Sequence, residues 1–212
     1  MKKSLIIACD GEAASGKSTG AKLISKKYKL LLINSGLFYR YASKLVLKHK
    51  PKKIIPFLKK KLINISYNKI SSQNLHSQDI SKHVGYLAKK KEVRLIINNL
   101  QKKIIKRNNR ICVEGRDIAS KILNKNPKYD IAFYFKCNID IASHRRWNDL
   151  KKKYPLNEVK KSLQVRTKLD KNRKFSPLKR VKNSILIETH KLNKAQMVSK
   201  MIKSIEKKLV KF

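Results

Sequence analysis

The sequence predicts an α/β protein built on a doubly wound parallel sheet. Short apolar runs typical of buried strands alternate along the 212 residues with longer amphipathic stretches typical of helices. Strands that alternate with helices form parallel βαβ units, with helices on both faces of one sheet. A glycine-containing loop follows the first run, and charged residues follow the third. Both features then fall at the carboxyl ends of strands, where such sheets bind ligands.

The expected strands are five short runs rich in Ile, Leu and Val. They lie at 5–9, 30–33, 110–114, 130–137 and 184–188. Helices are expected at 18–27, around Phe38 to Arg40, at 81–107 as one or two basic helices, and at 140–150, 156–171 and 194–210. The lysine-rich residues 151–155 predict a turn between two of these helices.

Residues 50–80 differ in character from the rest of the chain. Pro51 and Pro56 interrupt the helical periodicity. The alternating stretch 63–67 and the polar residues that follow it predict a small hairpin excursion. With no internal repeat and no long linker, we expect a single domain over residues 1–212.

The chain is strongly basic, with 54 Lys and Arg against 13 Asp and Glu, a formal net charge of +41. Such a charge is typical of nucleic-acid binding. However, the lysines are scattered in clusters at 48–53, 59–61, 89–91, 102–106, 151–153 and 200–211. The chain is also rich in Ile and Asn, whose codons are AT-rich like those of Lys. We therefore favour a compositional origin, with no specific nucleic-acid partner, over a polyanion partner.

The three cysteines, Cys9, Cys112 and Cys137, each fall in an expected buried strand. They show no metal-ligand spacing, and their number is odd, so we expect reduced core thiols in a cytoplasmic protein. The start of the chain resembles a lipoprotein signal, but its apolar part at 5–9 is shorter than the ~7–15 residues that a signal needs. No run approaches the ~18 apolar residues of a membrane span.

Residues 11–18 match the phosphate-binding pattern GxxxxGK[ST]. In this loop successive backbone N–H groups point at phosphate oxygens, the lysine reaches the β- and γ-phosphates, and the hydroxyl contacts Mg²⁺. We therefore expect an exposed Lys17 and a magnesium ligand in Ser18. The residues expected to bind ATP are Gly11, Glu12, Ala13, Ala14, Ser15, Gly16, Lys17, Ser18 and Thr19.

A second group of charged residues lies near the end of the helix expected at 156–171. Arg166, Asp170 and Arg173 are spaced i, i+4 and i+7, which places them on one face of a helix. A surface ion-pair ladder is the plain alternative, worth ~0.5 kcal/mol per pair. Arginines also stand at expected strand ends and loops, at Arg40 and Arg116, where their fork suits bidentate contact with phosphate.

Taken together, these motifs resemble the bacterial cytidylate (CMP) kinases, a family of P-loop nucleoside monophosphate kinases. The resemblance covers residues 5–210. It rests on Asp10-Gly11 with the loop, 34–36 with Tyr39-Arg40, Val93-Arg94, 114–117, 144–146, Arg166-x-x-x-Asp170-x-x-Arg173 and 176–178. It implies a monomeric cytoplasmic enzyme that uses ATP and Mg²⁺ to phosphorylate CMP and dCMP. It also implies a monophosphate-binding region at 36–107 and a short lid at about 147–160.

The resemblance also implies roles for individual residues. Three would hold the acceptor phosphate: Arg40, Arg116 and Arg173. Two would read cytosine: Arg94 and Asp117. Three would lie around the base or ribose: Ser35, Arg166 and Asp170. Two would act on the transferred phosphoryl group: Lys17 and either Arg145 or Arg146, with the choice between the two arginines left open.

The chain departs from the family pattern at a few positions. Glu12 stands where the family usually has Pro, Gly85 stands where many relatives have a Ser that touches the base, and Lys82-His83 replaces Ile-Arg. Two other functions stay open. One is a P-loop kinase for another small acceptor, and the other is a nucleic-acid-binding P-loop ATPase. The ATPase would need a strand-ending carboxylate, for which Glu114 is the one fair candidate, and the chain lacks a base-stacking aromatic patch.

Overall fold

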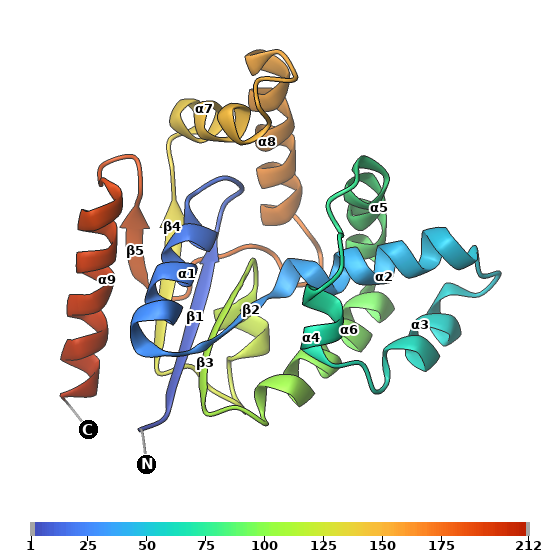
Figure 1. Ribbon diagram of the computed structural model, residues 1–212, viewed down its shortest axis with the longest axis horizontal. Helices are drawn as coiled ribbons and strands as arrows, with labels where there is room; N and C mark the ends of the chain where they lie inside the picture. The colour runs from blue at the N-terminus through green and yellow to red at the C-terminus, as the bar shows by residue number, and fades with distance from the viewer. Residues whose placement is uncertain (1–2, 211–212) are drawn as a thin grey trace. The chain divides into compact units, whose positions relative to one another are not determined.

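The computed structural model describes residues 3–210, and its centre is a five-stranded sheet of order β2-β3-β1-β4-β5 (Figure 1). The strands are β1 (Leu5–Gly11), β2 (Leu31–Asn34), β3 (Arg110–Gly115), β4 (Ile131–Lys136) and β5 (Ile185–Glu188). β1 pairs in parallel with β3 and with β4, and β4 pairs in parallel with β5. The predicted α/β class and the five strands are confirmed, and Cys137 follows β4 instead of ending it.

The chain divides into two compact units. The first unit comprises the residues before Ile33 and those after Asn109, and the second unit is Ile33–Asn109. Each unit has its own helices and is described by itself below. Among the described residues, no helix has the length and apolar content that crossing a membrane requires.

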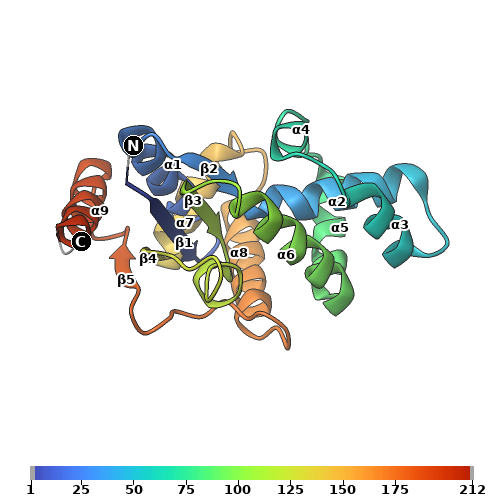
Figure 2. The same cartoon turned by 90° about the horizontal axis from the view of Figure 1, so that it is seen from below.

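The core of the first unit lies between the sheet and two helices, α1 (Lys17–Tyr28) and α9 (Lys194–Leu209), which Figures 1 and 2 show beside the strands. Ala21 and Ile24 of α1 and Met201 of α9 pack in the same buried cluster as Phe133 and Phe135 of β4. The spacing of the apolar residues along both helices therefore buries one face of each, as amphipathic helices require.

A smaller core joins two further helices of the first unit, α7 (Ile139–Asp149) and α8 (Leu156–Lys171), which lie side by side at the top of Figure 1. Val159 and Leu163 of α8 pack with Ala142 of α7 and with Ala13 of the loop after β1. The turn between these helices is present at the predicted position.

The buried cysteines of the sheet include a close pair. The Sγ atoms of Cys9 and Cys112 lie 3.8 Å apart across β1 and β3, and both side chains are fully buried free thiols. The contact with Cys112 and then burial raise the pKa of the Cys9 thiol well above its usual value, because both favour the protonated form. The prediction of free thiols in the core is confirmed.

After β2, the regular secondary structure of the second unit is helical, so the hairpin predicted within residues 50–80 is wrong. Its helices are α2 (Ser35–His49), α3 (Ile54–Leu62), α4 (Tyr67–Ser71), α5 (Gln78–Lys89) and α6 (Lys91–Ile105). The basic stretch at 81–107 forms parts of two helices that meet at Lys90, as one of the alternatives anticipated.

Local chemistry explains why this segment is helical. Pro56 stands in the first turn of α3, where a backbone N–H has no intrahelical acceptor and its absence costs little. Ser66 and Ser77 cap α4 and α5, each accepting a backbone N–H at 3.3 Å. The apolar alternation at 63–67 does not mark a strand face, since Ile63 is 65% exposed.

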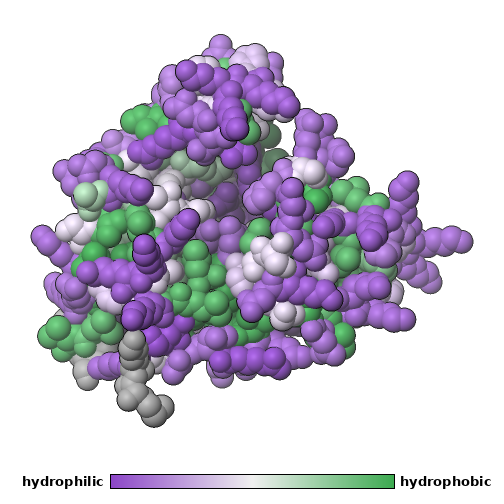
Figure 3. All heavy atoms as spheres, in the orientation of Figure 1, coloured by the Kyte–Doolittle hydropathy of each residue, from purple (hydrophilic) through white to green (hydrophobic). Residues whose placement is uncertain are grey.

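Hydrophilic side chains cover most of the face shown in Figure 3, and apolar ones appear between them as separate patches. This spread agrees with lysine clusters distributed along the whole sequence.

Candidate functional site

The loop after β1 has the backbone that the phosphate-binding pattern requires. Gly11 ends the strand so close to β4 that a Cβ atom would lie 2.5 Å from the carbonyl oxygen of Phe135. Gly16 precedes α1 with a φ of 76°, in the left-handed region that favours glycine. α1 then begins at Lys17, so the first N–H groups of the helix point toward the loop without intrahelical acceptors. Strand, loop and helix thus form an anion-binding arrangement.

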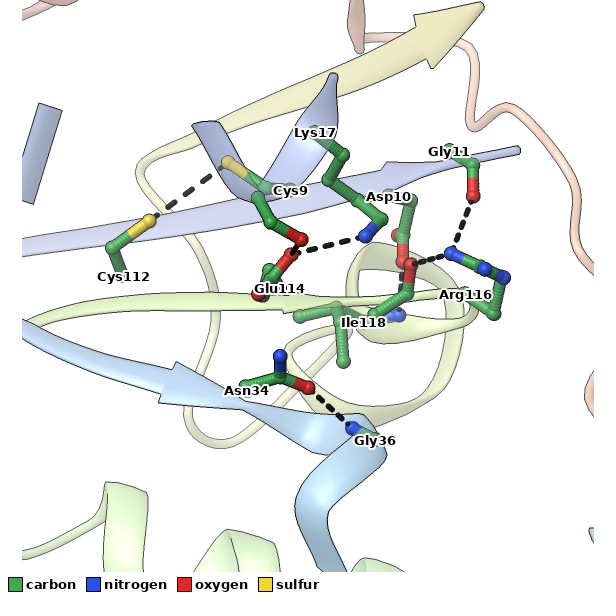
Figure 4. A network of polar contacts seen from close by, with 12 residues as sticks. Cys9, Asp10, Gly11, Lys17, Asn34, Gly36, Cys112, Glu114, Arg116 and Ile118 are labelled. Carbon is green, nitrogen blue, oxygen red and sulfur yellow. Dashed lines mark hydrogen bonds and ion pairs between the residues drawn. The ribbon is translucent and has the colours of Figure 1, made fainter. Parts of the chain in front are cut away.

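Lys17 contacts the carboxylate of Glu114 at the mouth of this loop (Figure 4), and Ser18 shares the same oxygen. Lys17 Nζ lies 3.0 Å from Oε2 of Glu114, and Ser18 Oγ donates to the same oxygen at 2.6 Å. Glu114 is near the end of β3, in register with Cys9 of β1, and is 3% exposed. The strand-ending carboxylate noted in the sequence therefore reaches the loop directly.

The expectation that Lys17 is exposed is wrong, because its side chain folds inward onto Glu114 and only 8% of the residue is exposed. Burial lowers the pKa of Lys17, and the neighbouring charge of Arg116 lowers it further, while Glu114 opposes both. A triphosphate at this loop would offer Lys17 phosphate oxygens in place of the carboxylate.

The hydroxyl of Ser18, at the start of α1, suits a magnesium ion. Among the described residues, no group of three or more His, Cys, Asp or Glu side chains is placed to hold a metal. Mg²⁺ in phosphate-transfer sites is bound mainly by substrate phosphates and water, with one or two protein oxygens. The hydroxyl of Ser18, with the carboxylate of Glu114 beside it, fits that donor set.

Asp10 joins the end of β1 to the segment that follows β3. Its two carboxylate oxygens accept the N–H groups of Ile118 and Ala119, each at 2.8 Å, and the residue is 2% exposed. Burial raises the pKa of Asp10 to about 6, although both hydrogen bonds favour the charged form. The clamp fixes the backbone immediately after Arg116 and Asp117. Sequence reasoning gave Asp10 no role of its own, although a carboxylate beside an apolar strand was a signal.

Arg116, Asp170 and Arg173 converge as predicted. Arg116 donates from Nε to Oδ2 of Asp170 at 2.9 Å and from Nη1 to the carbonyl of Gly11 at 2.9 Å. Arg173 lies 3.2 Å from the other oxygen of Asp170 and donates to the carbonyl of Ser176 at 2.9 Å. One carboxylate thus holds two arginines.

The expected single helix face needs correction. α8 ends at Lys171, so Arg173 stands beyond the helix and reaches Asp170 from the following turn. Arg166 lies on α8 itself and is exposed. Asp117, which precedes the short helical turn Ile118–Ile122, is 4% exposed.

The structure distinguishes the two adjacent arginines of α7. Arg145 donates to the side chain of Thr189 at 3.0 Å and to its carbonyl at 2.8 Å. Thr189 in turn donates to the carbonyl of Ser15 at 3.0 Å, which links Arg145 to the loop after β1. Arg146 is exposed. The role of Thr189 was missed, because nothing in its sequence neighbourhood indicates a contact with a loop 174 residues away.

The second unit holds the remaining predicted residues. Ser35 opens α2 and is buried, and Arg40 donates to the carbonyl of Leu75 and to the hydroxyl of Ser81, both at 3.0 Å. Arg94 is 4% exposed and lies 5.4 Å from the ring centre of Tyr39, the neighbour of Arg40 on α2. The two arginines are thus held by different parts of one helical unit.

Comparison with known proteins agrees with the motifs. The family model for cytidylate kinase matches residues 7–207. A cytidylate kinase from Clostridium botulinum (strain Okra / Type B1) is 32% identical over 215 residues, covering 95% of this chain and 97% of that protein. An uncharacterized protein from Eubacterium ventriosum has a TM-score of 0.58 at 16% identity, with 97% of this chain and 99% of that one covered. A shikimate kinase from Bacteroides thetaiotaomicron has a TM-score of 0.52 at 10% identity, with 95% and 98% covered. The two solved structures share the fold, and the sequence match shows that this chain belongs to the cytidylate kinase family.

Proposed function

We propose that this protein transfers the γ-phosphoryl group of ATP to CMP and dCMP. Membership of the cytidylate kinase family supports the reaction. The observation that carries the proposal is the pairing of Lys17 and Ser18 with Glu114 at the start of α1. These groups stand where a triphosphate and its metal would replace the carboxylate contacts.

On the donor side, residues 11–19 bind ATP, and Ser18 contacts Mg²⁺. The metal would neutralise charge on the β- and γ-phosphates. Lys17 exchanges Glu114 for a phosphate oxygen and stabilises the transferred group. A second cation, from the lid at about 147–160 or the helix before it, acts with Lys17 on the transferred phosphoryl group. Arg145 is a better candidate for it than Arg146, because Thr189 links Arg145 to the phosphate-binding loop.

On the acceptor side, three arginines bind the phosphate of CMP: Arg40, Arg116 and Arg173. Asp170 already holds two of them in the first unit, which orients their forks before substrate arrives. The residues assigned to the base and ribose are Ser35, Arg94, Asp117, Arg166 and Asp170. The monophosphate-binding region at 36–107 falls within the second compact unit.

Asp117 gives a chemical reason for preferring cytosine. A carboxylate accepts a hydrogen bond from the C4 amino group of cytosine but opposes the O4 acceptor of uracil. A site built for such a polar contact rejects an analogue that leaves it unpaired. CMP is therefore the preferred acceptor over UMP. Catalysis then consists of positioning and charge neutralisation, by a monomeric cytoplasmic enzyme.

The experiment measures ADP release with CMP, dCMP, UMP and AMP in turn, and with RNA or duplex DNA alone, at about 0.15 M salt. CMP should drive ADP formation one-for-one with CDP, while polynucleotide should leave ATP turnover unchanged. Non-specific polynucleotide binding should appear at low salt and fall steeply as salt rises. Better use of UMP or AMP than CMP would refute the acceptor. Stimulation by polynucleotide alone would overturn the kinase proposal.

A further inference from the structure

The phosphate-binding loop of this chain carries an acidic side chain at its second position, Glu12. A carboxylate in a loop that binds a polyanion adds repulsion to that ligand. The structure places a cation directly against it. Lys171 Nζ lies 2.7 Å from Oε1 of Glu12, and the Glu12 side chain is 13% exposed.

A backbone hydrogen bond anchors the Glu12 end of this pair, and the ion pair of a neighbouring residue anchors the Lys171 end. The N–H of Glu12 donates to the carbonyl of Phe135 at 3.2 Å, which holds the start of the loop beside β4. Lys171 is the last residue of α8, next to Asp170. Asp170 is in turn bound by Arg116, which also donates to the carbonyl of Gly11. Residues 11 and 12 of the loop are thus tied to residues 170 and 171 of the helix by two neighbouring links.

The pair lies on the wall of an open cavity of about 350 Å³. Lys168, one turn earlier on α8, lines the same cavity and is exposed. The side chain of Lys171 is 46% exposed, so it can be altered without disturbing the core. Lys168 is therefore a matched control, a second lysine on the same helix and cavity.

We propose that Lys171 is a positioning residue of the donor site, which neutralises Glu12 so that the loop accepts ATP. The proposal rests on the proposed function only in that the loop binds ATP. With Lys171 paired to Glu12, the net charge at this end of the loop is close to that of a loop with an uncharged residue at position 12. Without Lys171 the carboxylate of Glu12 faces the incoming triphosphate uncompensated.

The test is a titration of MgATP into the full-length protein without CMP, followed by steady-state kinetics. Lys171→Met should weaken ATP binding and raise the KM for ATP by about three- to tenfold at low salt, because one unit charge nearby is left unpaired. The double variant Glu12→Gln with Lys171→Met should return both to within about twofold of the wild type, since it removes the carboxylate as well. Lys168→Met should change neither the affinity for ATP nor the KM for ATP. The loss of affinity in Lys171→Met should shrink as salt rises.

Wild-type affinity in Lys171→Met would overturn the proposal. So would a double variant as weak as the single one, since Lys171 would then act independently of Glu12. A loss of the same size in Lys168→Met would do so too, because general basicity would explain it. If the wild type binds ATP but phosphorylates another acceptor, the acceptor assignment fails while these titrations still decide the role of Lys171.

Discussion

The two units hold their cationic side chains in different ways. In the first unit carboxylates pair with the cations: Glu114 binds Lys17, and Asp170 binds both Arg116 and Arg173. In the second unit Arg40 donates to a carbonyl and a hydroxyl, and Arg94 donates to the carbonyl of Ala88 at 3.4 Å.

The distribution of acidic residues underlies this difference. Only two of the 13 Asp and Glu residues, Asp79 and Glu92, lie between Ile33 and Asn109. The few acids of this chain are therefore concentrated in the unit that carries the phosphate-binding loop. Removing one partner of a buried ion pair leaves the other charge uncompensated, whereas losing a hydrogen bond to a neutral acceptor costs less free energy. Substitutions of the paired cationic residues in the first unit should accordingly have larger effects on activity and stability than those of cationic residues in the second unit.

The largest effect is expected for Lys17→Met. Turnover should fall by about a thousandfold at saturating ATP and CMP, because the variant loses a cation that acts on the transferred group. The free energy of unfolding should also fall by about 3 kcal/mol, since the buried carboxylate of Glu114 loses its ion pair with Lys17. Adding Glu114→Gln should recover part of that stability and none of the activity. Near-normal turnover in Lys17→Met would remove the loop from the mechanism.

A direct comparison of the units uses Arg116→Lys and Arg40→Lys. A lysine cannot reproduce the two directed contacts of Arg116 with Asp170 and Gly11, so the KM for CMP should rise by about 30- to 100-fold. For Arg40→Lys we expect about tenfold, because the contacts replaced include neutral oxygens. Initial rates at saturating ATP measure both. Equal effects in the two variants would show that carboxylate support does not set the size of the loss.

Asp117→Asn should change the choice of acceptor more than the rate. The amide can turn its NH₂ group toward O4 of uracil, so the ratio of kcat/KM for CMP over UMP should fall by about tenfold. Asp149→Asn, on the exposed end of α7, serves as the control and should leave the ratio unchanged. A ratio unaltered in Asp117→Asn would place the recognition of cytosine elsewhere.

The last prediction concerns Asp10 and the pH dependence of stability. Its pKa is about 6 in the folded protein against 3.8 for an ordinary Asp, so the folded state binds more protons between these values. The contribution of Asp10 to the free energy of unfolding should therefore decrease as pH rises from 3.8 to about 6, by about 3 kcal/mol in all. The charged groups that act on it are Asp117, which raises the pKa, and Lys17, which lowers it.

Denaturant unfolding of the wild type and of Asp10→Asn at several pH values isolates this contribution. The difference between the two free energies of unfolding should follow the stated trend and level off above about pH 6. A difference independent of pH across that range would mean that Asp10 has the same pKa in the folded and the unfolded protein.

Local patterns predicted the strands and the phosphate-binding loop, and the family resemblance assigned both Arg116 and Asp170 to the substrate site. Apolar runs and glycine positions are short-range signals, and parallel strands carry their ends to one edge of a sheet. The helices of residues 54–71 were missed because Pro56 reads as a breaker unless its place in the first helical turn is known. Three features depend on contacts between residues far apart in the chain: the burial of Lys17 against Glu114, the contact of Thr189 with Ser15, and the pairing of Lys171 with Glu12. No local pattern encodes such contacts.

The contact between Cys9 and Cys112 has a practical consequence for measuring motion in this protein. Thiol reagents attack the thiolate, and these two thiols are fully buried in β1 and β3. The rate at which an alkylating reagent labels them therefore reports how often the centre of the sheet opens to solvent. A nucleotide that binds only the closed protein slows that labelling in proportion to its occupancy. The alkylation rate of these two thiols, measured by mass spectrometry, thus reports the opening of the sheet without an added probe.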